Sequence, residues 1–91
     1  MKQKTRVLIA DDHALLRESM RILLDRQEDI EVVGEACDGE EAIKLSSELK
    51  PDIAIMDIVM PRLNGIEASK EIKKISPGTA IIILTAYDDA Q

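Results

Sequence analysis

Aromatic side chains are almost absent from this sequence, since Tyr87 is the only one among 91 residues. The apolar residues, 45% of the chain, are therefore almost all aliphatic, as is typical of the buried parallel strands of α/β proteins. Cysteine is scarce too. Cys37 stands alone, which excludes a disulfide within the chain and fits a reducing compartment such as the cytoplasm. We expect its thiol to be partly buried after a strand.

Basic residues are outnumbered, with 12 Lys and Arg against 18 Asp and Glu and a formal net charge of -6. Direct nucleic-acid binding needs a basic surface, so this composition argues against that function for the segment. No apolar run approaches the roughly 20 residues of a membrane span, and no apolar signal core follows residues 1–6. The acidic excess has two interpretations: general solubility, or an acidic pocket for a cation.

Short apolar runs alternate with segments of helical periodicity. Strands are predicted at 7–10, 30–36, 53–56 and 81–84, and helices at 14–26, after Asp38 and after Asn64. Asp38 and Asn64 each precede a glutamate by three residues, which predicts helix N-caps, and Pro51 ends the second helix. This order predicts a single α/β domain over 1–91, a parallel sheet with helices on both faces. The unbroken run at 53–56 predicts a strand covered on both faces.

Polar residues follow three of the predicted strands. Asp11 and Asp12 end the first, Asp57 ends the third and Thr85 ends the fourth. The carboxyl ends of parallel strands lie along one edge of a sheet, where ligands bind, so we expect these residues to meet there. A divalent cation relieves the repulsion between three carboxylates. Oxygen ligands with room for water suit Mg²⁺ or Mn²⁺ better than Zn²⁺.

Each of these residues also has an ordinary structural interpretation. An Asp pair before a helix is more often a cap, and an Asp at a strand end is usually a turn residue. His13 is expected at the exposed start of a helix, and no second histidine accompanies it in a zinc site. The presence of all these residues at the carboxyl ends of strands favours a functional site over separate structural roles. In such a site Asp57 can act as a nucleophile toward phosphorus, and the Thr85 hydroxyl can donate to a phosphoryl oxygen.

Four segments resemble the receiver domains of bacterial two-component response regulators, in the family's order. They are VLIADDH at 7–13, DIAIMDIVMP at 52–61, NGIEA at 64–68 and ILTAY at 83–87. The sequence around 11–13, 32–36 and 85–89 is most similar to receivers fused to a LuxR-type helix-turn-helix output domain.

The resemblance implies a flavodoxin-like fold, with strand order 2-1-3-4 over this chain and a fifth strand in a complete domain. It also implies that Asp57 accepts a phosphoryl group from a sensor histidine kinase. Asp12, Asp57 and the backbone carbonyl of Val59 would ligate Mg²⁺, with Mn²⁺ as an alternative, while Asp11 would act through a bound water. Thr85 would be the switch hydroxyl.

The sequence departs from the family pattern near its C-terminal end. A complete receiver continues through a fourth helix, a fifth strand ending in a lysine that contacts the phosphoryl group, and a fifth helix. Here no lysine follows Lys74, so the resemblance implies that 1–91 is an incomplete receiver. It is either a fragment of a longer regulator, which the incomplete helix start at 88–89 favours, or a chain whose missing parts another molecule supplies. We expect it to react poorly with phosphodonors. The run at 81–84 would then be an edge strand without proline or charge, through which we expect self-association.

We therefore predict a phosphoacceptor module and not an enzyme. Its parent protein would carry a DNA-binding output domain and regulate transcription, whereas this segment would contact neither nucleic acid nor membrane. One alternative is a pseudo-receiver that binds a partner without being phosphorylated. A second is a Mg²⁺-dependent phosphatase with an aspartyl intermediate, which is disfavoured because no insertion could form a substrate-covering cap.

Overall fold

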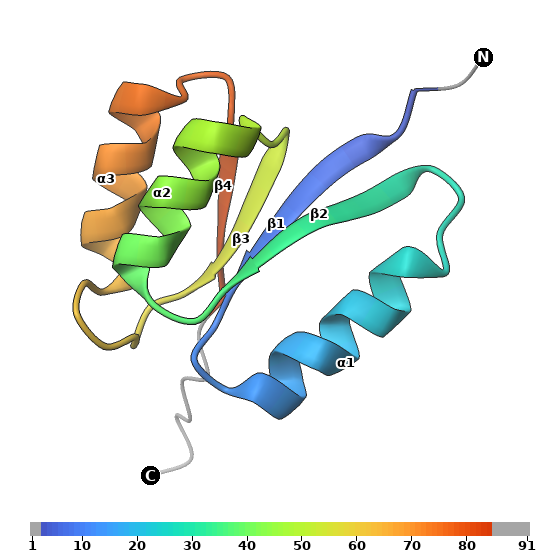
Figure 1. The fold of residues 1–91 in the computed structure, drawn as a ribbon, viewed down its shortest axis with the longest axis horizontal. Coiled ribbons are helices and arrows are strands. Elements are labelled where there is room, and N and C mark those ends of the chain that lie inside the picture. The colour runs from blue at the N-terminus through green and yellow to red at the C-terminus, as the bar shows by residue number, and fades with distance from the viewer. Residues whose placement is uncertain (1–2, 85–91) are drawn as a thin grey trace, which may run out of the picture.

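The computed structural model describes residues 3–84, which form a four-stranded parallel sheet of order β2-β1-β3-β4 (Figure 1). Strands and helices alternate along the chain, which confirms the predicted α/β class and strand order. The elements are β1 Thr5–Ala10, α1 Ala14–Asp25, β2 Ile30–Ala36, α2 Gly39–Leu49, β3 Ile53–Asp57, α3 Gly65–Ile75 and β4 Ala80–Leu84. Within this part of the chain no helix is both long and apolar enough to cross a membrane.

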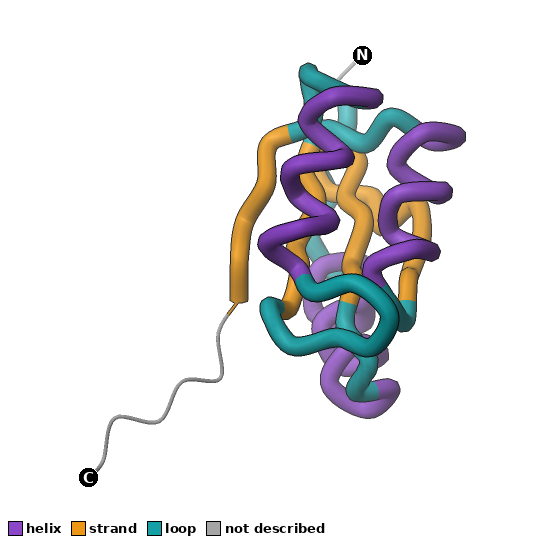
Figure 2. Tube along the Cα trace, turned by 90° about the vertical axis from the view of Figure 1, so that its left-hand side faces the viewer, coloured by secondary structure: helices purple, strands orange, loops and turns teal. Residues whose placement is uncertain are grey.

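The helices lie on both faces of the sheet, as predicted. Figure 2 shows α2 and α3 side by side in front of the sheet and α1 behind it. The hydrophobic core lies between the sheet and the α2–α3 pair, where small residues let the helices approach closely. Its buried members are Leu8, Ala10, Ala36, Ala42, Ala54, Met56, Met60, Ala68 and Ile72.

Strand β3 is well covered on only one face among the described residues. Ala54 and Met56 are completely buried, whereas Ile53 and Ile55 on the other face keep intermediate exposure. The reason is the position of α1, which packs against β2 and β1. Among the described residues, the prediction that both faces of this strand are covered therefore holds fully for one face and only in part for the other.

The predicted caps account for the helix boundaries. The side chain of Asp38 accepts a hydrogen bond from the Glu41 backbone N–H at 2.8 Å, and Asn64 accepts one from Glu67 at 2.9 Å. Helix α2 ends at Leu49, and its C-cap residue Lys50 lies in the left-handed region with φ of 47°, directly before Pro51.

Cys37 is exposed, which corrects the prediction that its side chain is partly buried. Strand β2 ends at Ala36, and the chain then turns outward into the cap of α2. There the Cys37 backbone N–H donates to the Glu41 carboxylate at 2.8 Å. This contact orders the backbone of Cys37 and leaves its thiol on the surface.

Candidate metal and phosphoryl site

The register of two central strands brings the predicted acids together. Strand β1 pairs in parallel with β3, with Ala10 opposite Met56, so the residues that follow lie opposite each other at the carboxyl edge of the sheet. One ligand atom from each of Asp11, Asp12, His13 and Asp57 lies within 4.8 Å of the others. The prediction that the three carboxylates meet is therefore confirmed, and the histidine joins them.

The acids differ in exposure and in hydrogen bonding. Asp11 is 1% exposed and Asp57 is 8% exposed, whereas the side chain of Asp12 is 34% exposed. Asp11 Oδ1 accepts a hydrogen bond from the His13 backbone N–H at 2.8 Å. Asp11 Oδ2 is buried and has no hydrogen-bond partner among the described residues.

An unpartnered buried carboxylate oxygen carries the full cost of losing its water contacts. A cation with its own bound waters would satisfy that oxygen and offset the repulsion between the acids. The donor set is made mainly of hard oxygen atoms, which suits Mg²⁺ or Mn²⁺. The residues present therefore fit the divalent ion that the sequence predicts.

His13 contacts all three acids, which the sequence interpretation did not anticipate. Its Nδ1 lies 2.9 Å from Asp11 Oδ1, 3.3 Å from Asp12 Oδ1 and 3.8 Å from Asp57 Oδ2. His13 is the exposed N-cap residue of α1, as predicted, but its side chain makes no cap hydrogen bond. Its position directly after the Asp pair was the signal available in the sequence.

The charge of the cluster changes how His13 titrates. The hydrogen bond to Asp11, then the negative charge of Asp12, raise the pKa of His13 above its ordinary value. The protonated ring therefore stabilises the folded chain. This contribution is fully present at pH values below the ordinary pKa of histidine. That contribution is lost as the pH rises through the raised pKa.

Arg17 holds the start of α1 against the end of β1. Its guanidinium donates to the backbone carbonyl of Asp11 at 2.5 Å and pairs with the Glu35 carboxylate at 3.1 Å. This arginine is mostly buried, and its partners are the backbone after β1 and a side chain of β2. It therefore fixes the position of the backbone that carries the acids.

The segment after Asp57 is held by a close backbone approach. The Gly65 N–H donates to the Ile58 carbonyl at 2.8 Å, and the α-carbon of Gly65 lies against the Asp57 carbonyl. Val59 lies in this segment with an exposed side chain, and its carbonyl stays a predicted metal ligand. Thr85, the predicted switch hydroxyl, lies outside the described residues.

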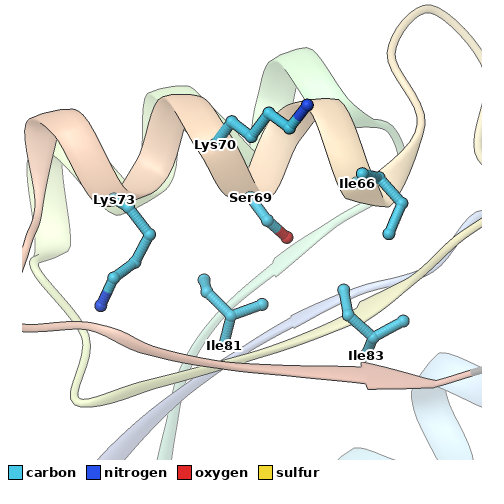
Figure 3. A pocket seen from close by; sticks show the side chains of 6 residues that line it. All are labelled: Ile66, Ser69, Lys70, Lys73, Ile81 and Ile83. Atoms are coloured by element: carbon cyan, nitrogen blue, oxygen red, sulfur yellow. The ribbon is translucent and has the colours of Figure 1, made fainter.

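A separate groove takes no part in the acidic cluster. It has a volume of about 490 Å³ and lies between α3 and β4 (Figure 3). Ile81 and Ile83 point from β4 toward Ile66 and Ser69 of α3. The amine of Lys73, at one end, donates to the carbonyls of Pro77 and Thr79.

Comparison with known proteins agrees with this geometry. Residues 7–91 match the family described as the response regulator receiver domain. The transcriptional regulatory protein YxjL of Bacillus subtilis is 48% identical over 87 residues, which cover 96% of this chain and 40% of YxjL. LiaR of the same organism, also a transcriptional regulatory protein, is 46% identical over 92% of this chain and 40% of its own length. The chain thus spans about 40% of the length of these relatives.

Solved structures show the same fold. The response regulator domain of Thermotoga maritima CheB superimposes with a TM-score of 0.89 at 44% identity, over 97% of this chain and 66% of that one. The receiver domain of the response regulator NarL from Mycobacterium tuberculosis also has a TM-score of 0.89, at 33% identity, over 97% of this chain and 71% of that one.

Proposed function

Because this chain belongs to the response regulator receiver domain family, we propose that Asp57 takes a phosphoryl group from a sensor histidine kinase. One observation supports this proposal above all. The Asp57 carboxylate lies with those of Asp11 and Asp12 at the carboxyl edge of the sheet, with ligand atoms within 4.8 Å of one another. The buried Oδ2 of Asp11 has no hydrogen-bond partner within residues 3–84. That is the arrangement a phosphoacceptor needs, since a cation held there would also neutralise phosphoryl oxygens.

In this proposal the metal is Mg²⁺, with Mn²⁺ as an alternative, and it is held by Asp12, Asp57 and the Val59 carbonyl. Asp11 contributes through a bound water. When bound, the ion supplies positive charge for the phosphoryl oxygens. A carboxylate oxygen of Asp57 attacks phosphorus, forming an O–P bond while the P–N bond to the donor imidazole breaks. Thr85 donates its hydroxyl to a phosphoryl oxygen of the product.

For the whole protein we propose a cytoplasmic transcription regulator in which this module controls a C-terminal DNA-binding domain. The names of the relatives, transcriptional regulatory proteins of greater length, support that role. The module itself would be no enzyme, since the aspartyl phosphate is its signalling state and not an intermediate of turnover.

Acetyl phosphate and Mg²⁺ give a direct test, read as the intact mass of the purified chain. We expect a single phosphoryl adduct on the unmodified chain and none on Asp57→Asn. The adduct should form slowly, because no lysine follows Lys74 to neutralise the phosphoryl group. Asp52→Asn is the control, since Asp52 lies just before β3, at the opposite end of the strand, and binds the Arg6 backbone.

The outcomes separate the alternatives. An adduct that persists in Asp57→Asn would contradict the assignment of the phosphoacceptor. Turnover of many donor molecules without a stable adduct would favour a phosphatase. No adduct on the unmodified chain, in the presence of bound Mg²⁺, would favour an interaction module that works without phosphorylation.

We also propose that the 91-residue chain self-associates through β4. This strand lies at the edge of the described sheet, where it pairs with β3 alone. Its apolar run, Ala80–Leu84, contains neither proline nor charge, the features that usually protect an edge from pairing. Two copies could pair these strands across a two-fold axis.

Replacing Ile82 with lysine should weaken this self-association at least about tenfold, because burying an isoleucine contributes roughly 1.5–3 kcal/mol. Ile82 is 45% exposed on the edge strand. The control is Ile22→Lys, since Ile22 is 53% exposed on α1, away from the edge. Sedimentation at several concentrations is the measurement. A monomer at all concentrations before any substitution would contradict the proposal.

A further inference from the structure

The Nδ1 atom of His13 lies among the three carboxylates and not outside them, although none of the roles proposed above uses it. We propose that the imidazole of His13 is a direct ligand of the cation site, and that it makes the site prefer divalent ions that accept nitrogen, such as Ni²⁺, over Mg²⁺. This inference rests on the proposed function only in taking the same acids as ligands.

The spacing of the atoms supports a shared ion. An ion with ligand distances of about 2.1 Å holds neighbouring ligands about 3 Å apart and opposite ones about 4.2 Å apart. The separations from His13 Nδ1 are 2.9 Å to Asp11, 3.3 Å to Asp12 and 3.8 Å to Asp57. These three separations match neighbouring or opposite positions around one ion. The four ligand atoms together lie within 4.8 Å of one another, so small side-chain rotations would let one ion contact the imidazole and the carboxylates.

A second observation points to a ligand beyond the four side chains. Asp11 is 1% exposed, and its Oδ2 lacks a hydrogen-bond partner among residues 3–84. The His13 ring contacts the other oxygen, Oδ1, at 2.9 Å. The internal contact between histidine and aspartate therefore leaves one buried acceptor unsatisfied, and an ion or its bound water would satisfy it.

His13 is also free to serve as a ligand. It occupies the N-cap position of α1 with an extended backbone, φ of -90° and ψ of 101°, and its side chain makes no cap hydrogen bond. Its side chain is 65% exposed, so an entering ion with its waters can reach the ring. Replacing it therefore removes a nitrogen donor at little cost to the helix.

Nitrogen donors distinguish between the candidate ions. Imidazole suits Ni²⁺ and related transition metals, whereas carboxylates, carbonyls and water suit Mg²⁺. Removing an imidazole ligand should therefore weaken Ni²⁺ binding much more than Mg²⁺ binding. Removing a carboxylate should weaken both ions, because it withdraws charge that either of them needs.

Calorimetric titration of the tag-free 91-residue chain with NiCl₂ and, separately, MgCl₂ tests the inference. Metal binding requires the neutral imidazole, so the titrations are carried out at about pH 8, above the ordinary pKa of histidine. Cys37→Ser is included in every protein compared, because Cys37 is an exposed thiol that could bind Ni²⁺ itself. The variants are His13→Ala, His13→Ser and Asp12→Asn. The serine variant keeps a side chain that can cap the helix.

Both His13 variants should raise the Kd for Ni²⁺ at least about tenfold and the Kd for Mg²⁺ less than about twofold. Asp12→Asn should raise both values at least about a hundredfold. Equal changes for the two ions in the His13 variants, or an unchanged Ni²⁺ affinity, would overturn the inference while leaving the proposed function intact. His13-dependent Ni²⁺ binding without any Mg²⁺ binding would support the inference and count against the proposed function. Binding of neither ion would overturn both.

Discussion

Replacing Asp12 with asparagine is expected to raise the Kd of the site for Mg²⁺ at least about a hundredfold. Even changes to residues that only support metal ligands commonly cost ten- to a hundredfold in affinity, and Asp12 is proposed as a direct ligand. The substitution removes a full negative charge while it keeps the shape of the side chain. Because the Asp12 side chain is 34% exposed, the fold should be retained.

Calorimetric titration with MgCl₂ measures this effect, and circular dichroism checks that the variant is folded. Asp52→Asn is the control for a change of net charge, since Asp52 lies just before β3 and its carboxylate accepts from the Arg6 N–H at 2.8 Å. We expect its Mg²⁺ affinity to stay within about twofold. An Asp12→Asn variant that binds Mg²⁺ as tightly as the unmodified chain would show that Asp12 is not a ligand.

Replacing Gly65 with alanine is expected to destabilise the domain by about 3 kcal/mol, the upper end of the usual cost of overpacking. An alanine in a helix normally stabilises it relative to glycine by about 1 kcal/mol, so the sign would be reversed. The reason is a close approach. A Cβ at Gly65 would collide with the carbonyl oxygen of Asp57 and press on the Cα of Ile58. These are backbone atoms, so the collision cannot be relieved by rotating a side chain.

Urea unfolding measures this loss, which is a large part of the about 5–15 kcal/mol of a typical small domain. Gly78→Ala is the control, because a Cβ at Gly78 would meet no atom within 4 Å. It should change the free energy of unfolding by less than about 0.5 kcal/mol. A Gly65→Ala domain as stable as the unmodified one would mean that the segment after Asp57 moves freely. That segment would then not position the phosphoacceptor.

The two substitutions act at different levels of the same site. Asp12→Asn should leave a folded domain with an altered cluster, since it changes only one exposed carboxylate. Gly65→Ala should disturb the scaffold itself, because the atom it strikes belongs to Asp57. A phosphorylation defect in Asp12→Asn would therefore come from the loss of a metal ligand. The same defect in Gly65→Ala would concern the placement of the phosphoacceptor.

The sequence by itself determined the elements, their order and the edge at which the acids meet. Hydrophobic periodicity depends on neighbours along the chain, and so do caps such as Asp38 with Glu41, which the structure contains as predicted. The parallel α/β arrangement places all the strand ends at one edge, and the strand order implied by the family resemblance places β1 beside β3, so Asp11, Asp12 and Asp57 were expected to meet there, as they do. The metal and phosphoryl roles of these residues rest on the chemistry of the acids and on the family resemblance, and they stay predictions.

Only the tertiary structure decided what depends on contacts between distant segments. How well the second face of β3 is covered depends on where α1 packs. The apolar run in the sequence is the same whether that face is covered or not. The closeness of Gly65 to the Asp57 carbonyl depends on the path of the intervening backbone. The position of His13 Nδ1 among three carboxylates depends on a side-chain rotamer and on the register between β1 and β3. Such distances join atoms from separate elements, so no local pattern of residues specifies them.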